Sequence, residues 1–253
     1  METKKEETKK EEGRVRKYKL LLDRESITGV RLEETRGKYV YLTYKKDNQY
    51  YVQLNDKIYG PYDYFDFITF SIDSSKYGWR YKKDDKWYVQ VNDKIYGPYD
   101  DYVYGVIFSP DGSKYGWYYI KDNKYYIQLN DKIYGPYDYG PYDYFYDITF
   151  SPDGSKYGWK YIKDNKYYIQ LNDKIYGPYD NIYGVIFSPD SSKLFSPDSS
   201  KYGWSYRENN KYYVQINDKI YGPYDKVDFT FTKDNKAIIA YILGDEIVIE
   251  EIE

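Results

Sequence analysis

The 253-residue chain contains no cysteine and no histidine, and it has one methionine. Without cysteine it can form no disulfide and offers no thiol nucleophile. Without histidine it lacks the commonest general acid–base group and the usual nitrogen ligand of zinc. We therefore expect a protein that is not an enzyme, with no cofactor and no metal site.

Long apolar runs and an excess of one charge are missing as well. No stretch approaches the ~20 residues of a transmembrane helix, and the start at 1–7 lacks the apolar core of a secretory signal. Thirty-eight basic residues face 41 acidic ones, a net charge of −3 that is well mixed along the chain. A nucleic-acid partner needs a concentrated basic face. We expect no nucleic-acid or membrane partner and, by default, a cytoplasmic location.

Tyrosine dominates what is present, with 41 copies against 10 phenylalanines and 5 tryptophans. Its ring is apolar, but its hydroxyl needs a partner or water when buried. Tyrosine also favours strands. This composition suits an all-β fold of thin, half-exposed layers better than one thick apolar core.

A repeat organises the chain. The segment Asn-Asp-Lys-Ile-Tyr-Gly-Pro-Tyr-Asp occurs five times, with spacings of 37, 38, 42 and 45 between its final aspartates. The two long spacings contain local duplications, of five residues at 139–143 and of eight residues around Phe187 and Phe195. Subtracting them leaves a period of 37 in both cases, which is in the range of repeats that form β-propeller blades.

One unit, 101–138, shows the internal pattern. Four short strand signals lie at 104–108, 114–120, 125–129 and 132–137, with turn residues between them. Pro136 cannot donate a ladder hydrogen bond, so the fourth strand should lie at a sheet edge. Four antiparallel strands in about 40 residues are typical of a propeller blade.

The units predict a six-bladed β-propeller with four-stranded antiparallel blades. An alternation of Thr and Ile in the innermost strands supports an even number of blades. The last unit has only three strand signals, and a spare strand signal lies at 14–24. We expect this N-terminal strand to pair with the last blade and close the ring, because an open ring would expose unpaired edges. The alternative is a loose leader and a three-stranded last blade. The predicted blades are about 28–63, 64–100, 101–138, 139–180, 181–225 and 226–253 plus 14–24.

We assign 14–253 to a single domain, preceded by a charged tail at 1–13 that we expect to be disordered. This tail contains five glutamates and four lysines.

The segment Phe-Ser-Pro-Asp-Gly-Ser-Lys at 108–114 and 150–156 resembles the inner hairpin of TolB-type, WD-like propeller repeats. The resemblance covers 28–253. It departs from that family in the Tyr-Gly-Trp that follows the turn and in the Tyr-Gly-Pro-Tyr-Asp ending. The resemblance implies a binding or scaffold domain with no shared catalytic residue. The near-identity of the units indicates recent amplification or deliberate design.

Three motifs resemble functional ones but have structural explanations. The segment 109–117 is similar to the Asp-box of sialidase propellers, but its spacing differs and the chain has only seven arginines. The Lys-Asp-Asn-Lys loops at 121–124 and 163–166 hold too few carboxylates for calcium. The tryptophans that follow a glycine in each unit could stack on sugars, but we interpret them as wedges between blades: Trp79, Trp117, Trp159 and Trp204.

The Gly-Pro-Tyr-Asp junctions are the candidate binding residues. In a propeller they lie on the face that commonly holds a ligand, and a ring of tyrosines and aspartates would suit a carbohydrate or a peptide. The structural alternative, which we favour, is that each junction only fixes the corner between blades. The candidate residues are Tyr62, Asp63, Tyr99, Asp100, Tyr137, Asp138, Tyr179, Asp180, Tyr224 and Asp225.

We expect a non-catalytic, monomeric scaffold or binding module, natural or engineered, that mediates protein–protein interaction. The alternative is a multivalent, lectin-like carbohydrate binder. A hydrolase would need carboxylates clustered at the propeller axis, for which only Asp66, Asp147 and Asp228 qualify. The sequence identifies no particular partner.

Overall fold

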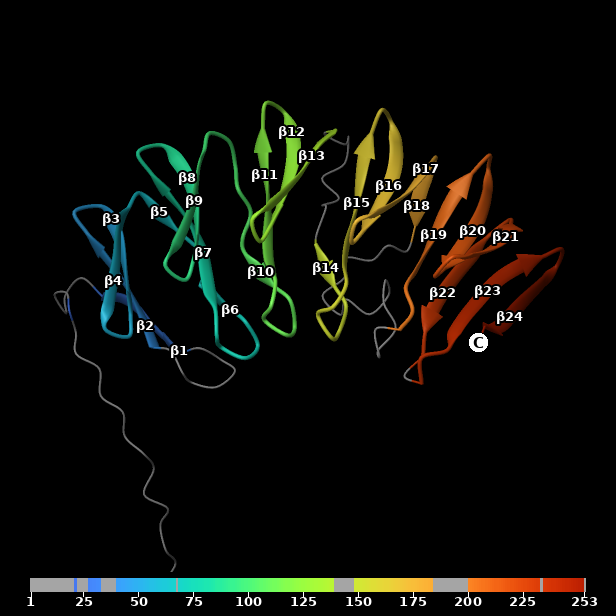
Figure 1. The fold of residues 1–253 in the computed structure, drawn as a ribbon, viewed down its shortest axis with the longest axis horizontal. Coiled ribbons are helices and arrows are strands. Elements are labelled where there is room, and N and C mark those ends of the chain that lie inside the picture. Colours follow the sequence, from blue (N-terminus) through green and yellow to red (C-terminus); the bar gives the residue numbers. More distant parts are fainter. Residues whose placement is uncertain are drawn as a thin grey trace, which may run out of the picture.

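The structure is a computed structural model, and it describes residues 21, 27–32, 40–66, 68–138, 148–183, 200–232 and 234–252. Within these residues the regular elements are all strands, which form six antiparallel sheets in chain order (Figure 1). No helix in this part of the chain has the length and hydropathy needed to span a bilayer. The predicted all-β fold with four-stranded antiparallel blades is confirmed, and the six sheets fit the six predicted blades.

In each sheet, neighbouring strands are hydrogen-bonded in the order in which they occur along the chain. The first contains β1 (Ile27–Leu32), β2 (Val40–Lys46), β3 (Gln49–Leu54) and β4 (Lys57–Tyr62). The second contains β5 (Tyr64–Phe65), β6 (Thr69–Phe70), β7 (Tyr77–Lys83), β8 (Lys86–Val91) and β9 (Lys94–Tyr99). Both β5 and β6 pair with β7, so together they form one interrupted inner strand.

The remaining sheets repeat this order. The third contains β10 (Ile107–Phe108), β11 (Tyr115–Lys121), β12 (Lys124–Leu129) and β13 (Lys132–Asp138). The fourth contains β14 (Thr149–Phe150), β15 (Tyr157–Lys163), β16 (Lys166–Leu171) and β17 (Lys174–Tyr179). The fifth contains β18 (Asn181–Tyr183), β19 (Gly203–Glu208), β20 (Lys211–Ile216) and β21 (Lys219–Tyr224). The sixth contains β22 (Val227–Phe231), β23 (Ala237–Leu243) and β24 (Glu246–Ile252).

The residues in the turns determine where these strands begin and end. Asp122 and Asn123 join β11 to β12 with positive φ values of 51° and 55°, which tight two-residue hairpins require and Asp and Asn tolerate. Pro136 lies in β13, which is an edge strand as predicted. Next to it Gly135 has φ 121°, and a Cβ there would lie 2.8 Å from Tyr125 O. Only glycine fits this corner.

Aromatic rings fill the wedges between sheets. The four tryptophans that follow a glycine are 0–1% exposed. Trp117 is typical, because the ring of Tyr96 from the preceding sheet contacts it edge-on with centroids 4.7 Å apart. The interpretation of these tryptophans as wedges is confirmed. Gly116, beside Trp117, brings the next sheet close, since a Cβ there would lie 2.6 Å from Ile148 Cδ1.

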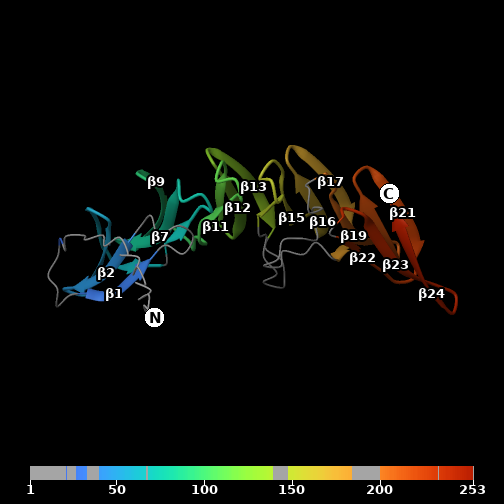
Figure 2. The ribbon, with the colours of Figure 1, turned by 90° about the horizontal axis from the view of Figure 1, so that it is seen from below.

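The described residues do not form the predicted closed ring. The first and last sheets lie at opposite ends of an open row in two perpendicular views (Figures 1 and 2). The sixth sheet has three strands, with β24 at its edge. Of the predicted closing strand at 14–24 only Leu21 is described, and its N–H donates to Gln53 Oε1 of the first sheet at 2.9 Å. This bond holds the chain at the end of the row away from β24.

Several predictions lie outside the described residues and stay untested. They are the charged tail at 1–13, both local duplications, and the inner strand at 185–187.

Candidate functional site

The tyrosines of the Gly-Pro-Tyr-Asp corners lie between sheets. Tyr62, Tyr137 and Tyr179 are buried, and Tyr99 and Tyr224 are half-buried. Each ring packs on a tyrosine of the next sheet, as Tyr137 does on Tyr161 with centroids 4.2 Å apart. Four further pairs have centroids 4.1–4.5 Å apart: Tyr62–Tyr81, Tyr99–Tyr119, Tyr179–Tyr206 and Tyr224–Tyr241.

The corner hydroxyls are used within the fold. Trp117 Nε1 donates to Tyr99 OH at 3.2 Å, and Trp159 Nε1 donates to Tyr137 OH at 3.3 Å. Burial raises the pKa of Tyr99 and of Tyr179 to about 12. These rings therefore contribute to packing between sheets, and little of their surface is open to a ligand.

Three of the corner aspartates tie their sheet to the next: Asp63, Asp138 and Asp180. Asp138 accepts hydrogen bonds from Lys124 Nζ of its own sheet at 2.5 Å and from the backbone N–H of Asp164, in a hairpin of the next sheet, at 2.6 Å. The Lys124 hydrogen bond is the main cause that lowers the pKa of Asp138. Corresponding N–H bonds reach two other corners, from Asp84 to Asp63 (2.7 Å) and from Asn209 to Asp180 (2.9 Å). Lys86 pairs with Asp100, and Lys211 with Asp225.

These contacts show how the corner residues pack and which hydrogen bonds they form. Ligand binding by the ten residues is not tested by them and stays a prediction. The corners do lie on the same face as the turns between the second and third strands, as expected. The structural role that we favoured for them accounts for their repetition.

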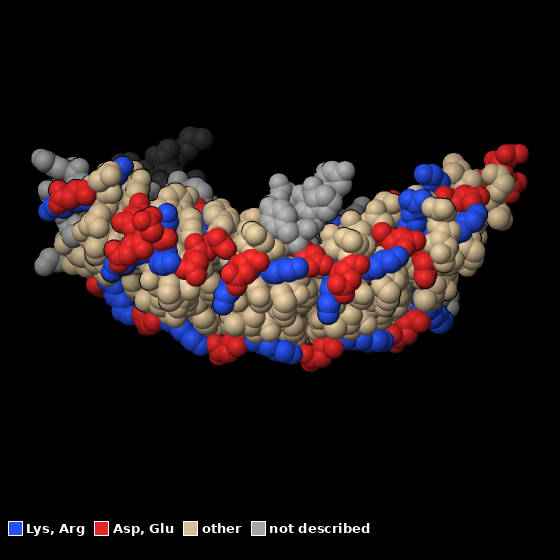
Figure 3. Space-filling model, turned by 90° about the horizontal axis from the view of Figure 1, so that it is seen from above, with Lys and Arg blue, Asp and Glu red and all other residues tan. Residues whose placement is uncertain are grey.

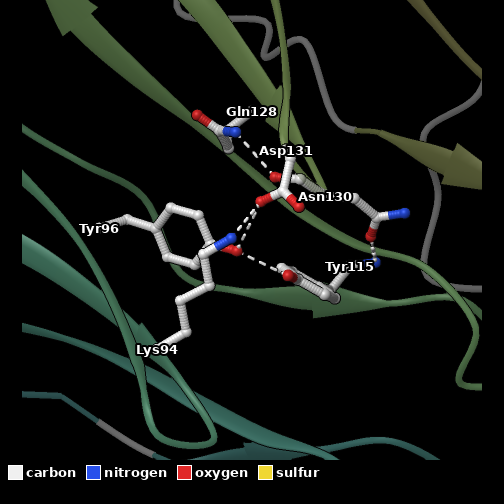
Figure 4. A network of polar contacts seen from close by, with 6 residues as sticks. All are labelled: Lys94, Tyr96, Tyr115, Gln128, Asn130 and Asp131. Carbon is white, nitrogen blue, oxygen red and sulfur yellow. Dashed lines mark hydrogen bonds and ion pairs between the residues drawn. The ribbon is translucent and has the colours of Figure 1, made fainter.

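A second polar network joins the sheets on the opposite face (Figure 4). Lys94 of β9 forms an ion pair with Asp131 of the third sheet, and Tyr96 OH lies 2.6 Å from Tyr115 OH. Asn130 Oδ1 accepts from the N–H of Tyr115 at 3.0 Å. Equivalent ion pairs join the other sheets from the first to the fifth: Lys57–Asp93, Lys132–Asp173 and Lys174–Asp218.

In each of these surface pairs the lysine and the aspartate neutralise each other's charge. Figure 3 shows acidic and basic side chains alternating in rows along the molecule. Exposed ion pairs contribute only about 0–1 kcal/mol each. They link neighbouring sheets and leave no single-sign field on the face shown that would attract a charged partner.

The strongest candidate site is a cluster at the second sheet, which we call the aromatic site: Tyr64, Trp87, Tyr102 and the ion pair of Arg80 with Asp66. The Trp87 ring is contacted edge-on by Tyr64, with centroids 5.6 Å apart, and by Tyr102, with centroids 5.3 Å apart. Tyr64 is 42% exposed and Tyr102 is 39% exposed. Unlike the corner tyrosines, these two rings offer open surface.

Arg80 lies beneath these rings. Its guanidinium Nη2 is 2.6 Å from Asp66 Oδ2, its Nη1 donates to Val103 O at 2.7 Å, and its Cζ lies 4.7 Å from the centroid of the Tyr102 ring. Burial acts to lower the pKa of Arg80, but hydrogen bonds to Asp66 and Tyr102 outweigh it and raise the pKa. The arginine is therefore a fixed positive charge that orients Tyr102.

A hollow of about 250 Å³ adjoins the aromatic site, between the first and second sheets. Tyr64 and Asp66 belong to its wall, together with Thr28, Tyr41, Thr43, Tyr50 and Phe65. Aromatic walls with a few hydroxyl and carboxylate oxygens are typical of a site for a small polar ligand.

The carboxylates considered for a hydrolase do not form a cluster in the described part of the chain. Asp66 is paired with Arg80, Asp228 lies in the sixth sheet, and Asp147 is outside the described residues. No group of three or more carboxylates that could hold a metal ion occurs among the described residues. These observations leave catalysis untested.

Sequence reasoning missed the aromatic site because it concentrated on what repeats. Trp87 stands where the other units have tyrosine: Tyr50, Tyr125, Tyr167 and Tyr212. Arg80 likewise stands where the neighbouring units have Thr43 and Tyr118. The departures of Trp87 and Arg80 from the repeat are the signal in the sequence that would have identified this site.

Comparisons with known proteins leave the family open. No family model matches the chain, and no curated protein matches it. Among solved structures it is similar to a protein assigned as a dipeptidyl aminopeptidase IV from Bacteroides ovatus, at 12% identity and TM-score 0.48, over 90% of this chain and 45% of that one. It is similar to the β-propeller domain of the Trilobed protease from Pyrococcus furiosus, at 13% identity and TM-score 0.43, over 90% and 82% of the two chains.

TolB from Acinetobacter baumannii is a third similar structure, at 16% identity and TM-score 0.32, over 71% of this chain and 49% of that one. The chain thus spans about half the length of the Bacteroides and Acinetobacter proteins. Because all three TM-scores are below 0.5, the assignment of propeller-type blades rests on the strand order of the chain itself.

Proposed function

We propose that this protein is a non-catalytic binding module that recognises a protein partner through the aromatic site. The observation that supports this most is the group of open rings, Tyr64 and Tyr102, flanking Trp87 over a fixed Arg80. Tyr, Trp and Arg are the residues that most often dominate the free energy of protein–protein binding.

Rigidity favours this role. Arg80 is held by Asp66 and by the Val103 carbonyl, so little side-chain entropy is lost when a partner covers it. The Trp87 ring is confined between two tyrosines. The surface is therefore preorganised.

Carbohydrate binding is the second candidate. It is favoured by the hollow beside Tyr64, where Thr28, Thr43 and Asp66 supply oxygens next to aromatic walls. A sugar could stack on Tyr64 and bond to these oxygens. This site would bind one ligand per chain, because Thr43 and Asp66 are replaced by other residue types at the equivalent positions of the other units, whereas a ring of corners would bind several.

Selection from a displayed peptide library on the immobilised full chain tests the proposal. We expect enriched peptides whose affinity falls about 5- to 30-fold in Tyr64→Ala and in Tyr102→Ala, since truncating such an anchor typically costs 1–2 kcal/mol. The matched control is Tyr183→Ala, an exposed tyrosine of the inner strand β18 in the fifth sheet.

Three results would count against protein recognition at this site. They are the absence of enriched peptides, equal losses in the control, and no loss in either test variant. Binding on a glycan array that disappears in Tyr64→Ala would select the carbohydrate candidate instead.

A further inference from the structure

The hollow between the first and second sheets lies where the next pair of sheets holds an arginine. Thr43 pairs with Val52 of β3, and Arg80 pairs with Val89 of β8, so the two residues occupy equivalent positions in their sheets. Thr43 belongs to the wall of the hollow, whereas the longer Arg80 reaches the third unit and donates to Val103 O at 2.7 Å. The hollow is therefore the space that a short side chain leaves where Arg80 fills the next interface.

The two rings beside Arg80 have counterparts in the wall of the hollow. Trp87 and Tyr50 are each the second residue of the third strand of their sheet. Tyr102 and Tyr64 each bond through the backbone to the sixth residue of the second strand. The guanidinium carbon of Arg80 lies 4.7 Å from the ring centroid of Tyr102 and 5.5 Å from that of Trp87. The same pair of positions, Tyr50 and Tyr64, thus supplies rings to the hollow.

The wall of the hollow also supplies oxygen atoms that suit a cation. Asp66 brings a carboxylate, and Thr28 and Thr43 bring hydroxyls whose oxygens lie 3.1 Å apart. None of the described residues in the wall is a lysine or an arginine. Asp66 accepts from Arg80 Nε at 2.8 Å through Oδ2, but a carboxylate has two oxygens with about four acceptor positions, so it can serve a second cation as well.

One ring of the wall already attracts a cation of the chain. Lys45 Nζ lies 5.1 Å from the centroid of the Tyr50 ring, and this lysine is exposed and does not belong to the wall. A cation is attracted to an aromatic ring within about 6 Å of its centroid. Because this attraction acts at contact distance, it does not need an excess of acidic charge over the surface.

The dimensions of the hollow suit the end of one side chain. Its volume of about 250 Å³ is below the ~300–1,000 Å³ of pockets for drug-sized ligands. Tyr41 in its wall is 5% exposed, whereas Tyr64 is 42% exposed. The hollow therefore reaches from a buried ring to an open one, which suits a long side chain entering by its tip.

We propose that the hollow binds the guanidinium of an arginine side chain of the protein partner, in the place that Arg80 takes in the next interface. Arginine stacks on aromatic rings, and its planar fork of N–H donors fits a carboxylate, whereas the lysine ammonium is a more strongly hydrated point charge. That a protein supplies the arginine rests on the proposed function. Cation binding itself rests only on the wall of the hollow and on its likeness to the Arg80 interface.

Titration of the isotopically labelled full chain with N-acetylarginine methylamide, followed by nuclear magnetic resonance, tests the hollow directly. We expect a dissociation constant on the order of 1 mM for this small probe. The matched control is N-acetylcitrulline methylamide, which has nearly the same shape and no charge. It should bind at least about 10-fold more weakly, because it loses the attraction to the rings and to the carboxylate. Equal binding of the two probes would overturn the proposal.

Two variants locate the bound probe. Thr43→Arg places a guanidinium of the chain itself in the hollow and should weaken probe binding at least about 10-fold, and Thr230→Arg is the matched control, an exposed threonine of the sixth sheet. Tyr64→Leu should weaken binding about 2- to 5-fold, as the loss of one exposed cation–ring contact predicts, whereas Tyr183→Leu should not. Circular dichroism confirms that each variant is folded. Undiminished binding in Thr43→Arg would overturn the proposal.

Peptides selected on the full chain separate this inference from the proposed function. We expect them to contain an arginine whose replacement by citrulline weakens binding at least about 10-fold in the parent chain and has little effect in Thr43→Arg. Peptides that depend on Tyr64 and Tyr102 but tolerate citrulline would overturn the inference and leave the proposed function standing. If no peptide is selected while the arginine probe still binds better than the citrulline probe, the proposed function fails and the guanidinium site stands. Tighter binding of N-acetyllysine methylamide, or glycan binding that Thr43→Arg abolishes, would overturn the assignment to arginine.

Discussion

Substitution of Gly116 by alanine tests the close approach of successive sheets. A Cβ at this residue would lie 2.6 Å from Ile148 Cδ1 of the next sheet and 2.7 Å from the carbonyl oxygen of Gln128. The side chain could move aside, but the carbonyl belongs to a paired strand and cannot. The matched control is Gly105→Ala, since no atom lies within 4 Å of a Cβ there.

The two substitutions should change stability in opposite directions. Replacing glycine by alanine at a compatible position stabilises by about 0.4–1 kcal/mol through the unfolded state, which is the expectation for Gly105→Ala. Overpacking costs about 1–3 kcal/mol, so Gly116→Ala should be destabilised by about 1–2 kcal/mol net.

Urea denaturation followed by circular dichroism provides the measurement, with the free energy of unfolding extrapolated to water. Equal effects of the two substitutions, or a gain in stability for Gly116→Ala, would refute the tight packing of Gly116 against Gln128 of its own sheet and Ile148 of the fourth sheet.

Three further predictions concern the corners and the turns. Tyr137→Phe should lose about 1 kcal/mol of unfolding free energy, since Trp159 Nε1 loses its acceptor, and Tyr137→Ala should lose about 3 kcal/mol or more in the same denaturation assay. The hydrogen bond from Ser109 is the main cause that lowers the pKa of Asp111 to about 2. The contribution of the Asp111 carboxylate to stability is therefore present above the ordinary aspartate pKa and lost as pH falls to about 2. Asp111→Asn should therefore flatten the pH dependence of the urea midpoint in this window. An unchanged pH dependence in the variant would contradict the prediction. Burial raises the pKa of Tyr99 and Tyr179 to about 12, so their contribution is complete below the ordinary tyrosine pKa and is lost as pH rises through about 12. Ultraviolet absorbance should show that a fraction of the tyrosines ionises only at high pH in the folded protein and at the ordinary tyrosine pKa in denaturant. A single transition for all tyrosines of the folded protein would contradict the prediction.

The blades could be predicted from the sequence because their signals are local. Asp-Asn hairpins, an edge proline and alternating apolar residues repeat at a fixed period, and each constrains only a few neighbouring residues. Ring closure was not predictable in this way. It depends on the angle between successive sheets, where a small difference accumulates over six units, and on which end of the row the N-terminal segment reaches. Leu21 is bound at the first sheet.

The candidate site was predictable only in part. The Tyr and Asp corners were found because they repeat, and repetition reflects packing: Tyr137 contacts Tyr161, and Asp138 binds the next hairpin. The aromatic site uses Arg80 and Trp87, which depart from the repeat. Contact between Trp87 and Tyr102 joins two successive units, and a pattern within one unit does not reveal it.

Hydrogen–deuterium exchange, with and without a peptide selected on the full chain, tests the central claim most directly. We predict added protection in segments containing Tyr64–Asp66 and Asp101–Tyr104, with no change at the corners Asp180 and Asp225. Equal protection at all five corners would contradict the account and would support the ring of corner residues as the binding surface.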